Sequence, residues 1–175
     1  MGCMGNGDCT DAAAPFCDPE TDTCVACNGM EDPDAACAEL DSMAPLCVGE
    51  ACVQCTPENP AVCDAQLLVC DGSTGSCVAC TEHAQCGSGA CELDPKVGRC
   101  FPGDFVVHVD GDGGADYTTI VDAVADVPND GHGVIVVHER DGGADYGPTL
   151  ISAGSKIIAL LAAPGEAPII QGTGS

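Results

Sequence analysis

Apolar residues follow different patterns in the two parts of this chain. Residues 1–100 contain no isoleucine and one aromatic residue, Phe16, and their recurring apolar feature is cysteine, in four sets of four with a period of about 26 residues. Residues 101–175 hold all seven isoleucines and four of the five aromatic residues, in short runs between polar turns. This change predicts two domains, four tandem modules at 1–100 and a different fold at 101–175.

Beyond residue 100 the pattern predicts one helix and several short strands. Thr118 or Thr119 can cap a helix that carries Ile120 and Val124 on one face and ends before Pro128. Short strands are expected at residues 105–109, 134–138, 149–152, 156–162 and 168–171. Because no helices separate the last four strands, a solenoid of parallel strands fits better than a doubly wound sheet.

The cysteines indicate a disulfide framework. An even number at near-regular spacing in small, loop-rich modules is typical of secreted, disulfide-stapled proteins. We expect two bridges in each module, mostly irregular backbone with short β hairpins, and three possible connectivities per module. The four sets are Cys3, Cys9, Cys17, Cys24; Cys27, Cys37, Cys47, Cys52; Cys55, Cys63, Cys70, Cys77; and Cys80, Cys86, Cys91, Cys100.

Zinc is the competing interpretation of the same cysteines. The pairs at 24–27, 52–55 and 77–80 have the C-x-x-C spacing with which two thiolates bind one tetrahedral ion. The intervals between these pairs exceed the usual spacing of zinc ribbons, and the other ten cysteines would have no role. A thioredoxin-like redox site would need a surrounding βαβ pattern, which the sequence lacks. Disulfides are therefore preferred. If the cysteines bound zinc instead, the protein would be an intracellular metal-binding protein.

The charge balance restricts the partners of the protein. With 28 acidic and four basic side chains the net charge is −24, which disfavours binding to nucleic acid and to anionic membranes. The excess of acid suits divalent cations, basic partners or simply solubility. The sequence contains no apolar run of about 18 residues that would span a membrane. It also contains no signal peptide, so we expect an extracellular or cell-surface fragment whose export signal lies upstream.

The cysteine modules resemble a known kind of repeat. The start at residues 3–9 (C-x-x-x-x-D-C), the Cys-Asp pair at 17–18 and the close at 24–27 (C-V-x-C) are similar to short cysteine-rich repeats of large bacterial surface and secreted proteins, especially in myxobacteria. They also resemble the N-terminal cysteine-rich region of Dickkopf proteins. The resemblance covers most of residues 3–100 and implies extracellular location and modular architecture, without an activity.

The last part of the chain resembles another family. Residues 116–124 (DYTTIVDAV), 134–137 (VIVV), 156–160 (KIIAL) and 168–172 (PIIQG) look like the opening of right-handed parallel β-helix proteins of the pectin-lyase-like class, closest to pectin methylesterase N-termini. The resemblance implies an all-β solenoid whose apolar end is covered by an N-terminal capping helix. In that family the catalytic carboxylates and arginine lie in later coils, so no catalytic residue can be assigned here.

Few side chains offer other chemistry. Asp110, Asp112 and Asp116 have the spacing of part of a calcium loop, although Ala115 and Val121 stand where an EF-hand needs glycine and glutamate. The sequence DGGAD occurs at 112–116 and again at 141–145, and both copies follow Val-Val-His. Solvated turns are the preferred interpretation, with calcium as the one candidate cofactor. The four histidines, at positions 83, 108, 132 and 138, show no spacing to a nucleophile and are expected at polar strand ends.

These patterns lead to one main functional hypothesis and one alternative. The main hypothesis is a secreted or cell-surface modular protein, in which a cysteine-rich spacer or interaction array is joined to a β-helix that binds polysaccharide or another extracellular protein. The alternative is the N-terminal fragment of a pectin-lyase-like esterase or lyase. Since these 175 residues show no catalytic group, we do not expect them to act as an enzyme.

Overall fold

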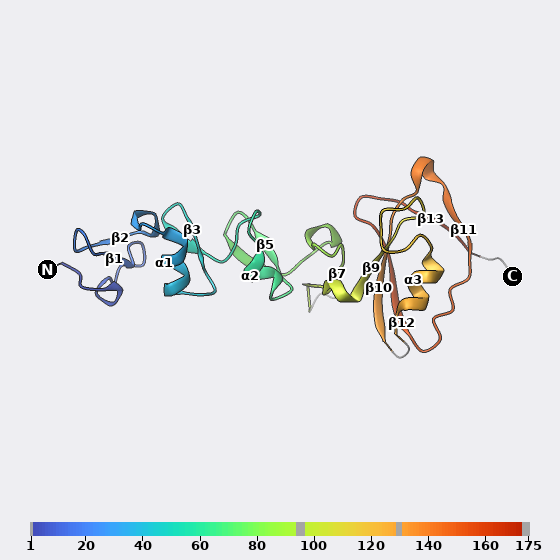
Figure 1. Cartoon of the computed structure of the whole chain (residues 1–175), viewed down its shortest axis with the longest axis horizontal. Helices are drawn as coiled ribbons and strands as arrows, with labels where there is room; N and C mark the ends of the chain where they lie inside the picture. The colour runs from blue at the N-terminus through green and yellow to red at the C-terminus, as the bar shows by residue number, and fades with distance from the viewer. Residues whose placement is uncertain (1, 94–96, 129–130, 173–175) are drawn as a thin grey trace. The chain divides into compact units, whose positions relative to one another are not determined.

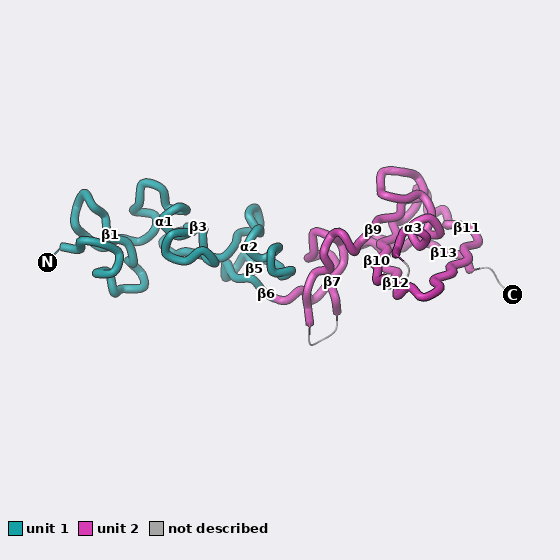
Figure 2. The backbone as a smooth tube through the Cα atoms, turned by 60° about the horizontal axis from the view of Figure 1, so that its bottom comes forward, with its two compact units in different colours: residues 1–78 teal, residues 79–175 magenta. Residues whose placement is uncertain are grey.

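The protein forms two compact units in its structure, a computed structural model that describes residues 2–93, 97–128 and 131–172. The first unit spans residues 1–78 and the second spans residues 79–175 (Figure 2). The first three cysteine modules make up the first unit, while the fourth groups with the C-terminal segment. The division expected near Cys100 rests on composition and stays a prediction.

Each module of the first unit is a short antiparallel hairpin preceded by a helical turn. The hairpin strands are β1 Phe16–Asp18 with β2 Thr23–Val25, β3 Leu46–Val48 with β4 Ala51–Val53, and β5 Val69–Asp71 with β6 Ser76–Val78. The helical segments are η1 Asn6–Asp8, η2 Cys27–Gly29, α1 Pro33–Leu40 and α2 Ala61–Asp64. Helix α1 begins after Asp32, whose carboxylate accepts the N–H of Ala35 at 3.2 Å, with Pro33 in the first turn.

All eight disulfides stay within their modules and follow one connectivity. The first cysteine of each module bonds to the third and the second bonds to the fourth. The bonds are Cys3–Cys17, Cys9–Cys24, Cys27–Cys47, Cys37–Cys52, Cys55–Cys70, Cys63–Cys77, Cys80–Cys91 and Cys86–Cys100. The third and fourth cysteines lie opposite each other in every hairpin. Directly opposed side chains point to the same face, so both sulfurs reach the side on which the first two cysteines lie.

Neighbouring modules of the first unit touch through a few local contacts. Phe16 is fully buried and packs against Cys27 and Cys37 of the second module. Between the second and third modules, the N–H of Gln54 donates to the carbonyl of Gly75 at 2.9 Å. Gly75 has φ +65°, and a β-carbon there would lie 2.7 Å from the side chain of Val53, so glycine is required. Modules are therefore coupled to their nearest neighbours, as in other repeat proteins.

The second unit combines the fourth module with a set of parallel strands. The fourth module contains η3 His83–Gln85, β7 Cys91–Glu92 and β8 Arg99–Cys100. It is followed by η4 Gly103–Phe105, β9 Val106–Val109, α3 Ile120–Asp126, β10 His132–Val137, η5 Asp141–Gly143, β11 Asp145–Thr149, β12 Ile157–Ala162 and β13 Ile169–Gly172.

Two parallel sheets are built by alternating strands. One sheet has the order β12–β10–β9, with Val134 of β10 opposite Val106 and Ala159, and α3 lies beside it (Figure 1). The other sheet pairs β11 with β13 and contains a register shift. The chain therefore passes from the first sheet to the second and back, because β10, β11, β12 and β13 alternate between them.

The central strand β10 is buried on both faces. Its residues 134–137 (VIVV) are each at most 3% exposed, the pattern of a strand covered on both sides. One face packs against α3, in a cluster of Val109, Ile120, Ala123, Val124, Ile135 and Val137. On the other face, Val134 and Val136, together with Val106 of β9, pack against Ala90 and Phe101 at the end of the fourth module. The fourth disulfide module thus covers one side of the parallel sheet.

Helix α3 is closed at both ends by side chains. The hydroxyl of Thr119 accepts the N–H of Asp122 at 3.1 Å, which confirms the expected cap. At the other end, Nζ of Lys156 donates to the carbonyls of Val124 and Ala125 at 2.7 and 2.9 Å. A cation at this end also favours the helix dipole.

The expected strands differ from the observed ones in one place. The strands expected at 105–109, 134–138, 156–162 and 168–171 match β9, β10, β12 and β13 within two residues at either end. The strand expected at 149–152 is wrong, since β11 lies earlier, at Asp145–Thr149. Gly147 and Pro148 are unfavourable in a strand, but tertiary pairing with β13 holds this segment extended. None of the helices in the described ranges has the length and hydropathy needed to cross a membrane.

Candidate functional site

The cysteines act as covalent cross-links. Among the described residues no cysteine is free. Cys24 and Cys27, the first C-x-x-C pair, belong to different bridges, to Cys9 and Cys47 respectively. In each module three sulfurs lie within 4.8 Å of one another, close enough for a metal site, but all are bonded to sulfur. The disulfide prediction for the cysteine-rich repeat is therefore confirmed, and the thiolates that zinc would need are consumed.

The first three modules are strongly acidic. Residues 1–78 contain 14 acidic side chains and no lysine or arginine. Some of these carboxylates close local turns: Asp18 and Asp71 hold equivalent places after the third cysteine of their modules. The pKa of Asp71 lies below its ordinary value, chiefly because the hydroxyl and N–H of Ser73 donate to it. The pKa of Asp18 is lowered first by the hydroxyl of Thr21. Such carboxylates stabilise the loops.

The three calcium candidates take separate roles. Oδ1 of Asp110 accepts the N–H of Asp112 at 2.9 Å, and Oδ2 of Asp116 accepts the N–H of His108 at 2.9 Å. Asp112 bonds to Arg140 and to the N–H of Asp141. Within the described ranges, sets of three or more possible ligand atoms converge only among cysteines. The structure does not bring these carboxylates together, and calcium binding stays a prediction.

Arg140 and Tyr146 organise the loop after β10. Nη2 of Arg140 donates to Oδ1 of Asp112 at 2.9 Å, and its Nη1 donates to the carbonyl of Asp145 at 2.9 Å. The Asp112 hydrogen bond raises the pKa of Arg140. The hydroxyl of Tyr146 accepts a hydrogen bond from the N–H of Gly111 at 3.1 Å. It donates one to the carbonyl of His138 at 2.8 Å. These contacts join the two copies of DGGAD, which lie on adjacent loops.

Two histidines and a glutamate form a hydrogen-bonded chain at one end of the parallel sheet. Nδ1 of His108, on β9, lies 3.0 Å from Nε2 of His138, just after β10. The other ring nitrogens are also engaged: His108 Nε2 with the carbonyl of Ser88 at 3.2 Å, and His138 Nδ1 with Oε1 of Glu166 at 3.2 Å. The second oxygen of Glu166 accepts the N–H of Glu139 at 2.6 Å, which is the main cause of the lowered pKa of Glu166.

This histidine chain lacks a nucleophile. A serine–histidine–carboxylate site needs the serine hydroxyl within hydrogen-bond reach of the imidazole. Here Ser88 contacts His108 through its backbone carbonyl, while its hydroxyl points to the carbonyl of Ala90 at 3.5 Å. The arrangement therefore links two imidazole rings to a carboxylate, and in this geometry it offers no attacking group.

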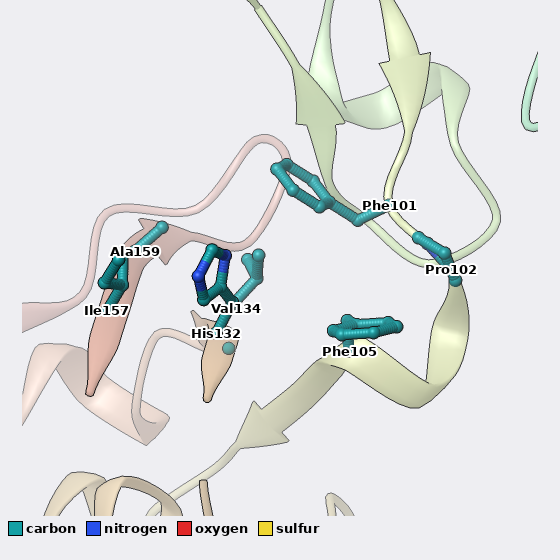
Figure 3. A pocket seen from close by; sticks show the side chains of 8 residues that line it. Phe101, Pro102, Phe105, His132, Val134, Ile157 and Ala159 are labelled. Atoms are coloured by element: carbon teal, nitrogen blue, oxygen red, sulfur yellow. The ribbon is translucent and has the colours of Figure 1, made fainter. Parts of the chain in front are cut away.

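One pocket of the second unit is almost entirely apolar. It has a volume of about 390 Å³ and is framed by Phe101, Phe105 and Val134, with His132 and Ile157 across from the aromatic rings (Figure 3). His132 is its one side chain with polar atoms. Sugar recognition needs several convergent hydrogen-bonding groups, so this pocket suits an apolar group better than a polysaccharide.

A second pocket of this unit is polar. It has a volume of about 430 Å³ and is lined by Arg140, Tyr146, Pro148 and Thr149 together with residues 118–121 and Gly111. An arginine, a tyrosine and three threonines supply the hydrogen-bonding groups and the aromatic surface that polar ligands use. Of the two pockets, this is the one whose chemistry fits a carbohydrate.

The histidine chain was missed in the sequence because its successive members are 20 to 30 residues apart along the chain. The available signal was the repeat of Val-Val-His before both DGGAD copies, at His108 and His138. In a parallel sheet, equivalent positions of two repeats come to the same edge. Both histidines lie at strand ends, as expected, but Ser88 and Glu166 carried no sequence signal.

Comparison with known proteins identifies the cysteine-rich part. The model of a family of unknown function, DUF8331, matches residues 1–106. No curated protein and no solved structure matches the chain. The comparisons bear on the modules alone, so the resemblances to Dickkopf repeats and to pectin-lyase-like proteins stay predictions. Since the match covers more than half of the 175 residues, this chain belongs to the family of unknown function DUF8331.

Proposed function

We propose that the protein is an exported modular protein whose cysteine array serves as a spacer and interaction surface and whose last part begins a parallel β-helix that binds polysaccharide. The observation that carries this proposal is the pairing of all 16 cysteines in eight intramodular disulfides. Disulfides persist in oxidising compartments, and small secreted domains without a large core depend on them. The extracellular space or the cell surface is therefore the expected location.

The composition of the modules supports a binding role over a catalytic one. Their buried residues are largely the cysteines themselves, together with Phe16, Val69 and Ala90. Their surface carries many carboxylates, which favour basic or cationic partners and repel phosphate-rich ones. Rigid modules in series act as spacers that present such a surface.

The spacing of the parallel strands supports a β-helix. His132 lies opposite Ile157, 25 residues later, and Asp145 lies opposite Ile169, 24 residues later. Two different sheets therefore repeat with nearly the same period, as successive turns of a solenoid do. Helix α3 covers the apolar cluster of β9 and β10, the first two strands of this series, which is where a capping helix would lie.

The polar pocket supports polysaccharide as the ligand class. Arg140 provides a cation in a chain with four basic residues, and Tyr146 and Thr149 add an aromatic ring and a hydroxyl. A guanidinium with nearby hydroxyls suits the carboxylate and hydroxyl groups of acidic sugars. Binding without cleavage is expected, since the lining of this pocket includes no carboxylate that could act as nucleophile or base. The alternative, an esterase or lyase fragment, predicts cleavage of pectin.

Two measurements test the proposal. The intact, secreted chain should gain about 16 mass units on reduction under denaturing, chelating conditions, one for each cysteine. An unchanged mass with release of zinc would contradict the proposed compartment and function. Titration with oligogalacturonate should show binding that is weakened by Arg140→Gln and unchanged by Arg99→Gln, a matched change on the exposed strand β8. Equal binding by both variants would remove the pocket as the site, and release of product would favour the enzyme.

A further inference from the structure

The contact between His108 and His138 requires a proton between the rings. Their facing nitrogens are 3.0 Å apart, and the ring centroids are 5.3 Å apart at an interplanar angle of 32°. The rings thus meet nitrogen to nitrogen, at the distance of an N–H···N hydrogen bond. A zinc ion in line would need these nitrogens about 4 Å apart, and in the described part of the chain three ligand atoms converge only among cysteines. A proton fits where a metal does not.

The number of protons on the two rings follows from their other partners. The carbonyl of Ser88 can only accept, so Nε2 of His108 must carry a proton. Glu166 accepts two hydrogen bonds as a carboxylate, so Nδ1 of His138 must carry one as well. The bond between the rings needs a third. Two neutral imidazoles carry two protons, so the complete chain of hydrogen bonds holds one extra proton and one positive charge, shared by the two rings.

This chain joins the fourth module to the parallel sheet. Ser88 lies in the loop between Cys86 and Cys91, His108 lies on β9, His138 follows β10 and Glu166 follows β12. The same loop places Ala90 against Val106 and Val134. One line of three hydrogen bonds therefore connects the disulfide module with the ends of all three strands of the sheet.

We propose that His108 and His138, with Ser88 and Glu166, form a proton-operated latch that holds the fourth module on the parallel sheet. Adding a second extra proton places two N–H groups face to face and breaks the bond between the rings. Removing the first extra proton leaves two lone pairs facing each other between the rings, or else breaks the hydrogen bond to the Ser88 carbonyl or to Glu166. The latch is complete only with one extra proton, so it opens on acidification, when the pair of rings takes up a second extra proton and both imidazoles are charged.

Carboxylates lie around the two rings. Glu166 pairs with His138, and Glu139 follows His138 along the chain. The carboxylate of Asp116 accepts a hydrogen bond from the backbone N–H of His108. The loop at residues 87–90 of the fourth module contributes no charged side chain. The extra proton of the complete chain therefore lies among groups of opposite charge, which is a favourable place for a cation.

Hydrogen exchange of the intact, oxidised chain tests the latch. Between pH 7.5 and pH 5, protection of residues 86–93 and 97–101 should fall at least about tenfold after correction for intrinsic exchange, because a charge-assisted hydrogen bond is lost. Protection of residues 55–77 in the third module should not change. His138→Gln should remove the difference between the two pH values, since its amide cannot carry the extra proton. His132→Gln, an exposed change on the same strand, should retain the difference.

The wild-type protein provides a second measurement in case His138→Gln does not fold. Nitrogen-15 spectra of the imidazoles should show protonated Nε2 in His108, protonated Nδ1 in His138 and one intermediate shift shared by the facing nitrogens. Two independent titrations, with an unprotonated Nε2 in His108, would overturn the proposal. So would equal protection of residues 86–93 and 97–101 at both pH values, or a pH response that survives in His138→Gln.

Discussion

Removing a single bridge from the third module tests whether the array is stabilised module by module. Cys63 is fully buried and bonds to Cys77, 14 residues later. Closing a loop of this size restricts the unfolded chain by about 3 kcal/mol. With both cysteines replaced by alanine, protection from hydrogen exchange within residues 55–77 should therefore fall on the order of 100-fold. The other modules should keep their protection, because no disulfide crosses a module boundary.

The fourth module provides the contrasting case. Replacing Cys86 and Cys100 by alanine removes a bridge with the same sequence separation of 14 residues. Here the loss should spread into the sheet, since Ala90 and Phe101 of this region pack against Val106 and Val134. Peptide-resolved hydrogen exchange under oxidising conditions distinguishes the two variants. If the Cys63 and Cys77 variant loosened every module, or if the Cys86 and Cys100 variant left the sheet untouched, the reasoning from local bridges and shared cores would be refuted.

Three further predictions concern individual side chains. Phe16→Ala should destabilise the first two modules by about 3–5 kcal/mol, measured by their hydrogen exchange, because the ring is fully buried between them; an effect confined to the first module would contradict this. Lys156→Met should lower the stability of the second unit by about 1 kcal/mol in thermal unfolding, since it removes the cation at the end of α3. Lys156→Arg should retain most of that stability, because it keeps the positive charge. The pKa of Asp71 is lower in the folded protein than its ordinary value of 3.8. The contribution of this carboxylate to folding stability is therefore present above that value and is lost as the pH falls through the folded pKa. Acid loosening of the hairpin should be weaker in Asp71→Asn, and an identical acid response would exclude this carboxylate as its cause.

The sequence alone determined the features that depend on local chemistry. Cysteine spacing predicted modules and disulfides, because small, loop-rich segments have few other means of stabilisation. The capping threonine and the apolar face predicted α3, since helix ends and helix faces are local properties. The apolar run at 134–138 predicted a strand for the same reason.

Other features depended on contacts between distant residues, which only the tertiary structure decided. The disulfide connectivity required the third and fourth cysteines to face the same side of a hairpin, a geometry that spacing cannot show. Strand β11 formed against local turn preference because β13 pairs with it. The fourth module reads as part of the cysteine array, yet Ala90 and Phe101 complete the core of the parallel sheet. The hydrogen bond between His108 and His138 depends on strands β9 and β10, which become neighbours only in the folded protein, since hydrogen bonding and burial depend on proximity in space.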